Sequence, residues 1–119
     1  MKDEKNDLRS RTKAFALRII ALYETLPRSG AAHVLGHQLL RSGTSVGANF
    51  REAYRARSNA EFLSKVGDCL KELEETAYWL ELLSDCGAVK PAKLASLVDE
   101  TSQLIAILTT IAKKIRARL

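Results

Sequence analysis

The chain has 119 residues, of which 46% are apolar and 28% are charged, and it contains only six glycines and two prolines. This composition is typical of one compact soluble domain and excludes a disordered tail. Because helix breakers are few, a mostly helical chain is favoured and folds with many strands are excluded. The formal net charge of +5 suggests an acidic partner without identifying it.

The N-terminal segment and the cysteines indicate where the protein resides. The chain is charged from Lys2 onward and no apolar stretch follows, so we expect no secretory signal and a cytoplasmic location. The most apolar run, residues 104–112, has about half the length that crosses a bilayer, so no membrane partner is expected. Cys69 and Cys86 lie 17 residues apart on one predicted helix, too far apart for a disulfide.

Two helices are predicted in the first half of the chain. The first covers residues 8–26, with Asp7 as its N-cap, and ends before Pro27. The second covers residues 31–57 and has two glycines at its centre, each of which costs about 1 kcal/mol relative to alanine in an exposed helix. Their apolar faces, spaced by three and four, consist of Phe15, Ile19, Leu22 and Leu26, and of Leu35, Leu39, Ser42, Val46, Phe50 and Ala53.

The second half predicts two more helices with clearer ends. The third covers residues 59–86, begins with a capping box formed by Ser58 and Glu61, and stops at Gly87. The fourth covers residues 91–117 and begins with Pro91, which suits a first helical position. Their apolar faces consist of Phe62, Val66, Cys69, Leu73, Thr76, Leu80 and Leu83, and of Leu94, Leu97, Thr101, Leu104, Leu108, Ile111 and Ile115.

Short connections between long helices predict an all-α, up-down-up-down antiparallel four-helix bundle in a single domain, residues 1–119. Both helices of the second half also carry a second apolar line. This second line indicates either a subunit interface or a wide core-facing surface, and the pattern alone leaves both possibilities open. Its members are Leu63, Leu70 and Ala77 on the third helix, and Val98, Ile105, Ala112 and Leu119 on the fourth.

Antiparallel topology gathers positive charge at one end of the predicted bundle, where the first and third helices begin and the second and fourth end. With Arg18 included, this half holds fourteen of the nineteen cations and six of the fourteen carboxylates, a net charge of +8, and leaves −3 for the other half. Such an end can bind RNA or DNA phosphates, although cations in a last helical turn also favour the helix dipole. The predicted nucleic-acid contacts are Arg51, Arg55, Arg57, Lys113, Lys114, Arg116 and Arg118.

No catalytic constellation is present in the sequence. His33 and His37 have a spacing that can place two imidazoles on one metal, but the chain has no other histidine. The carboxylates at positions 72, 74 and 75 lack the Glu-x-x-His pairing of di-iron bundles, and no phosphate-binding glycine loop or nucleophile motif occurs. We therefore predict no catalytic residues, no metal, no cofactor and no enzymatic activity.

The hairpin between the second and third helices brings polar residues together. If its turn lies near residues 57 and 58, Arg41 faces Glu74 or Glu75, and Asn49 faces Lys65 or Val66. We interpret these contacts as setting the register of two helices that approach closely at the glycines of positions 43 and 47, in preference to a ligand site.

The segment from Gln38 to Leu83 resembles the signature of the four-helix bundle proteins encoded in bacterial 23S ribosomal RNA intervening sequences. The resemblance depends on the run Arg41–Asn49, on Glu52 and on Ser58, and continues through the third helix to the triplet at positions 78–80. The structural motif residues that it assigns are Arg41, Asn49, Glu52, Lys71, Glu75 and Trp79.

The resemblance implies a homopentameric barrel of four-helix protomers with a basic surface. The accessory variability proteins of diversity-generating retroelements, which are similar in fold, assist a reverse transcriptase and bind nucleic acid. Two functions are therefore expected as alternatives. One is a non-enzymatic, oligomeric accessory protein that binds RNA or DNA at its basic end, and the other is a scaffold that docks a protein partner such as a reverse transcriptase.

Overall fold

The computed structural model describes residues 2–119, with side chains from Asp7 onward. It contains four helices, α1 (Lys2–Thr25), α2 (Gly30–Tyr54), α3 (Asn59–Asp85) and α4 (Pro91–Arg116). No strand occurs within residues 2–119. The predicted all-α, four-helix class is confirmed.

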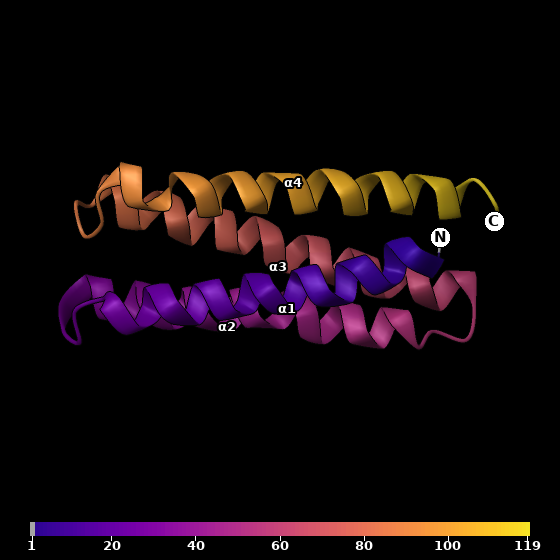
Figure 1. The fold of residues 1–119 in the computed structure, drawn as a ribbon, viewed down its shortest axis with the longest axis horizontal. Helices are drawn as coiled ribbons and strands as arrows, with labels where there is room; N and C mark the ends of the chain where they lie inside the picture. Colours follow the sequence, from indigo (N-terminus) through magenta and orange to yellow (C-terminus); the bar gives the residue numbers. More distant parts are fainter. Residues whose placement is uncertain (1) are drawn as a thin grey trace.

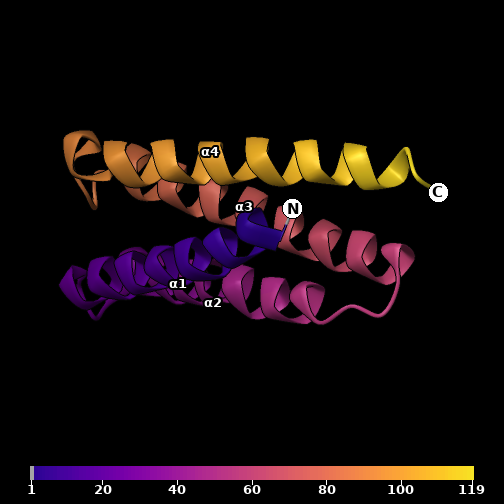
Figure 2. The same ribbon diagram turned by 45° about the vertical axis from the view of Figure 1, so that its right-hand side comes forward.

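The four helices lie side by side in a body of 46 × 20 × 20 Å. Figure 1 shows the α1–α2 and α3–α4 turns at one end, and the α2–α3 turn at the other end with both chain termini. The close packing is between consecutive helices, α1 with α2, α2 with α3 and α3 with α4. Figure 2 shows α4 set apart from the α1–α2 pair, with α3 between them.

The predicted apolar faces form the core. Every residue of the α3 and α4 faces is buried, including the polar Thr76 and Thr101. On α1 and α2 only Leu22 and Leu35 remain half-buried, and both pack against the core. Burial of these faces is the main stabilising contribution to the bundle.

Two helix boundaries differ from the prediction by more than one residue. The first helix begins at Lys2 and not at Leu8, because the preceding segment of lysine and acidic residues contains no helix breaker. The second helix ends at Tyr54 and not at Arg57, because the chain must turn before Ser58 takes an extended conformation as the N-cap of α3. The Ser58 hydroxyl accepts from the Glu61 N–H at 3.0 Å, as predicted. The Glu61 carboxylate accepts from the N–H of Arg57 at 3.1 Å, one residue before the cap.

The glycines at the centre of α2 face α1 and not α3, which corrects the predicted approach. A Cβ atom at Gly43 would lie 2.7 Å from Cγ1 of Ile19, and one at Gly47 would lie 3.4 Å from the carbonyl oxygen of Thr12. The α2–α3 contact is made one residue earlier, where the buried hydroxyls of Ser42 and Thr76 are 2.8 Å apart. The glycines therefore allow α1 to pack closely on α2.

The second apolar line is only partly covered within one chain. Leu63, Leu70 and Ile105 pack against the edge of the core, whereas Val98 is 44% exposed and Leu119 is 68% exposed. By length and composition α4 is apolar enough to cross a membrane, and it is the one such helix in the described part of the chain. Eight of its residues are buried against the bundle, which is the usual reason for such a composition in a core helix.

Candidate nucleic-acid interface

The seven predicted contact residues are located at the end of the bundle that holds the α2–α3 turn and the C-terminus (Figure 1). We call this the basic end, defined by Arg51, Arg55, Arg57, Lys113, Lys114, Arg116 and Arg118. All seven side chains are exposed. Among residues 7–119 none of the seven forms an ion pair, so no carboxylate in this part of the chain neutralises their charges.

Local helix geometry explains why cations are tolerated at this end. Arg51 lies in the last turn of α2, and Lys113, Lys114 and Arg116 lie in the last turn of α4. The partial negative charge at a helix C-terminus stabilises such cations by a few tenths to about 1 kcal/mol each. In this position the cations interact favourably with the helix dipole, and their charged groups remain in solvent, where a phosphate can reach them.

Two of the seven cations share one hollow. Arg57 and Arg118 line a depression of about 210 Å³, together with Ser58 and Asn59. Phe62 and Ile115, both buried, form its floor. The structure therefore joins the α2–α3 turn to the C-terminal segment in one polar surface with two guanidinium groups.

Arg9 and Arg18 change the composition of the basic end. The guanidinium carbon of Arg9 lies 4.6 Å from the ring centroid of Tyr54, so a cation–π contact holds this arginine beside the end of α2. Arg9 was not among the predicted contacts, and only the pairing of α1 with α2 reveals it. Arg18 donates to Ser96 at 2.8 Å in the second turn of α4, so it belongs to the opposite half. Arg11 pairs with Glu100 of the other half, so these two charges cancel and the net charges of the two halves become +6 and −1.

A second polar cluster lies halfway along the α2–α3 surface. Arg41 donates to Glu72 at 3.2 Å and also to Glu75, which is the expected contact across the hairpin. These bonds raise the pKa of Arg41, with the Glu72 hydrogen bond as the largest cause. Glu52 pairs with Lys65 at 3.5 Å, about two turns further along α3. The series of ion pairs fixes the register of α2 against α3.

The remaining motif residues surround this cluster. Asn49 and Lys71 line a hollow of about 200 Å³ with Arg41, Asp68 and Glu72, so Asn49 lies one turn from its predicted neighbours at positions 65 and 66. Trp79 packs against the core with its indole Nε1 buried, and that nitrogen has no hydrogen-bond partner among the described residues. The hollow is lined by two cations and three carboxylates, so it does not add to the basic end.

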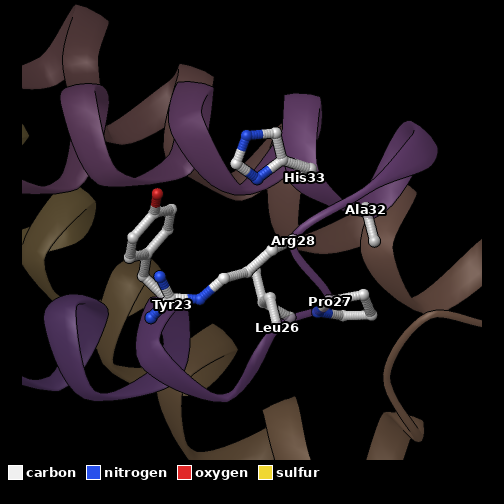
Figure 3. A pocket seen from close by; sticks show the side chains of 6 residues that line it. All are labelled: Tyr23, Leu26, Pro27, Arg28, Ala32 and His33. Atoms are coloured by element: carbon white, nitrogen blue, oxygen red, sulfur yellow. The ribbon is translucent and has the colours of Figure 1, made fainter.

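The two histidines are at the opposite end, in the first part of α2, and Figure 3 shows His33. Their ring centroids are 4.6 Å apart, and the Tyr23 hydroxyl lies 3.3 Å from Nε2 of His37. Among residues 7–119 no group of three or more histidine, cysteine, aspartate or glutamate side chains is placed to hold a metal ion. Because both histidines lie at the end opposite the basic end, neither can take part in phosphate binding there.

Comparison with known proteins gives the family of this chain. A family model described as 23S rRNA-intervening sequence protein matches residues 4–110. The chain belongs to this family. No curated protein matches the chain.

A solved structure supports the assignment of this chain to the 23S rRNA-intervening sequence protein family. It is a crystal structure from Bacteroides thetaiotaomicron, described as a protein with unknown function from the S23 ribosomal protein family. It superposes with a TM-score of 0.86 at 38% identity, over 92% of this chain and 98% of the other. The resemblance inferred from the hairpin is thus confirmed, and neither description names an enzymatic activity.

Proposed function

We propose that this 23S rRNA-intervening sequence protein is a non-enzymatic accessory protein that binds RNA or DNA phosphates through its basic end. The observation that carries the proposal is the set of seven exposed cations that form no ion pair with the carboxylates of residues 7–119. Cations in this arrangement release counterions from a phosphate backbone and give binding with little sequence preference. Of the aromatic residues near the cations, Tyr54 is half-buried and Phe62 is buried, so stacking on bases contributes little.

We also propose that the protomer is an up-down-up-down bundle that assembles into a homopentamer in the cytoplasm. The number five comes from the family resemblance. Support for self-association comes from large apolar side chains that one chain leaves exposed, among them Leu17 at 57%, Val34 at 61% and Tyr78 at 53%. Sedimentation equilibrium tests this assembly, and a monomer at micromolar concentration would contradict it.

The test of nucleic-acid binding is a charge reversal with a matched control. Arg55→Glu with Arg57→Glu lowers the net charge by four at the basic end, and Lys90→Glu with Lys93→Glu lowers it equally at the opposite end. We expect the first pair to weaken binding of single-stranded RNA and DNA oligonucleotides more than about tenfold at 0.1 M salt. The second pair should leave the affinity within about twofold, measured by fluorescence anisotropy. Equal losses in both pairs would show a net-charge effect and refute a basic-end site.

An alternative function is the docking of a protein partner without direct nucleic-acid contact. It is favoured by an open groove of about 400 Å³ between α1 and α4, with Leu22 and Leu97 as apolar lining and Arg18 and Lys93 at its rim. A partner such as a reverse transcriptase would then be captured equally well by the Arg55→Glu, Arg57→Glu variant. Loss of oligonucleotide binding together with retained capture would show that both functions exist on separate surfaces.

A further inference from the structure

Three potential metal ligands meet where α1 packs on the first turns of α2. His33 and His37 are one helical turn apart, and their rings are nearly perpendicular with centroids 4.6 Å apart. Tyr23, from the last part of α1, reaches the same place, with its hydroxyl 3.3 Å from His37 Nε2. Figure 3 shows the Tyr23 ring rising from α1 toward the helix that carries His33. We propose that Tyr23, His33 and His37 form a binding site for a late first-row divalent metal ion such as Ni²⁺, Cu²⁺ or Zn²⁺.

The distance between Tyr23 and His37 is the first argument. Nitrogen and oxygen ligands lie about 2.0–2.2 Å from such an ion, so two ligands at tetrahedral or square angles are about 3.0–3.4 Å apart. The observed separation of 3.3 Å falls in this range, and it is long for a hydrogen bond from a hydroxyl group. The oxygen and the nitrogen are therefore spaced as two ligands of one ion.

The position of Tyr23 is fixed by packing, which is the second argument. A Cβ atom at Gly36 would lie 3.4 Å from the Tyr23 ring and 2.9 Å from Cδ1 of Leu26. Because residue 36 has no side chain, the half-buried Tyr23 ring lies directly against α2. A ligand held in place before binding loses little conformational entropy when the ion arrives.

The chemistry of the ligands selects the class of ion. Neutral imidazole nitrogens favour nickel, copper and zinc, whereas calcium and magnesium require a shell of oxygens. A cavity of about 40 Å³ adjoins His33, large enough for a water molecule to complete the coordination. Imidazole must lose its proton to bind the ion, so affinity should fall as the pH is lowered.

One nearby charge opposes binding and provides a test of position. Arg28 lines the same cavity, and Figure 3 shows its side chain extending toward Tyr23. Its pairing with Glu24, at 3.9 Å between two exposed groups, neutralises it only in part. Arg28→Gln should therefore strengthen metal binding by a few-fold.

The experiment is a calorimetric titration with Ni²⁺, which does not oxidise the exposed thiol of Cys86. We expect one ion per chain. Either His33→Ala or His37→Ala should weaken binding at least about tenfold, since even outer-shell changes at metal sites cost that much. Tyr23→Phe keeps the packing against Gly36 and should weaken binding by a smaller factor. Cys86→Ser should bind as the natural chain does.

The matched control keeps two histidines in α2 but moves the second away from the helix face that carries His33. His37→Ala combined with Gln38→His places the imidazoles five residues apart, on different sides of the helix. Circular dichroism checks that each variant keeps its helices. Equal affinity in this variant, or no saturable binding up to millimolar Ni²⁺, would overturn the site. Unchanged affinity in Tyr23→Phe would overturn the three-ligand arrangement.

Discussion

Gly43 determines how closely α1 and α2 can pack. A methyl group at this position would lie 2.7 and 2.8 Å from the two γ carbons of Ile19, which is fully buried and cannot move aside. We expect Gly43→Ala to lower the free energy of unfolding by about 1–3 kcal/mol, because overpacking outweighs the better helix propensity of alanine. Urea denaturation followed by circular dichroism measures the change.

Gly67 provides the matched control, because it lies within α3 with nothing within 4 Å of an added Cβ. Gly67→Ala should raise the free energy of unfolding by about 0.5–1 kcal/mol. In an Ile19→Ala background the cost of Gly43→Ala should become much smaller, since the clashing γ carbons are gone and only the Cβ of residue 19, at 3.1 Å, remains. An undiminished cost in that background would place the strain elsewhere.

The two cysteines should differ sharply in reactivity. Burial of Cys69 raises the pKa of its thiol to about 12, whereas Cys86 is exposed near the end of α3. Since only the thiolate reacts, Ellman's reagent at pH 8 should modify one thiol per chain quickly and the second only after unfolding. Cys86→Ser should remove the fast phase alone. A fast phase of two thiols in the folded protein would contradict the burial of Cys69.

At the scale of elements, polar side chains link α1 to α4, which are not among the closely packed helix pairs. Arg11 donates to both carboxylate oxygens of Glu100, at 2.8 and 2.7 Å, and to Gln103. These bonds lower the pKa of Glu100, with the side-chain hydrogen bond from Arg11 as the largest cause. Both groups are mostly covered, with 27% and 17% of the side chains exposed, so the pair stabilises the bundle more than a surface pair does.

The lowered pKa of Glu100 determines how the stability of the protein depends on pH. A carboxylate with a lowered pKa in the folded state stabilises the protein at neutral pH, and this contribution is lost as the pH falls through that pKa. Arg11→Met should reduce the free energy of unfolding by about 1 kcal/mol at pH 7 and by much less near pH 3. Arg28→Met removes the exposed pair with Glu24 and should change little at either pH. Equal losses at both pH values would point to lost packing and not to charge.

The sequence predicts the helices better than it predicts their neighbours. Spacings of three and four identify every buried residue of α3 and all of those of α4 except Ala112, because each helix buries one side. The same spacings cannot tell which neighbour a residue faces, so Gly43 and Gly47 were assigned to α3 although they face α1. The start of α1 was also misplaced, since Asp7 lies inside a helix that begins at Lys2, although aspartate is more typical of helix caps.

The candidate sites could likewise be predicted from the sequence only in part. Charge at the basic end follows from topology, because helix direction places whole segments at one end. Predicting the contact of Arg9 with Tyr54, or that of Tyr23 with His37, requires the rotation of α1 about its axis to be known. Helix rotation depends on how side chains of both helices interlock, and a single sequence does not specify it.

At the scale of the whole molecule, the two ends carry opposite net charge along an axis of 46 Å. This length exceeds the Debye length at physiological salt, roughly 8 Å, several times over. A phosphate at the basic end is therefore attracted by that end alone, and the carboxylates of the opposite half do not weaken binding. Affinity should depend on where a cation lies and not on the total charge.

The salt dependence of binding tests whether affinity depends on the position of the cations. Each phosphate contact with a single strand contributes about −0.7 to the slope of log affinity against log salt. Replacing Lys113 and Lys114 by alanine removes two contacts at the end of α4, so the slope should become shallower by about 1 to 1.5. Lys90→Ala with Lys93→Ala removes the same charge at the opposite end and should leave the slope unchanged. Anisotropy titrations of a single-stranded RNA between about 50 and 200 mM salt give both slopes. Equal slopes in the natural chain and the Lys113, Lys114 variant would exclude these lysines as phosphate contacts.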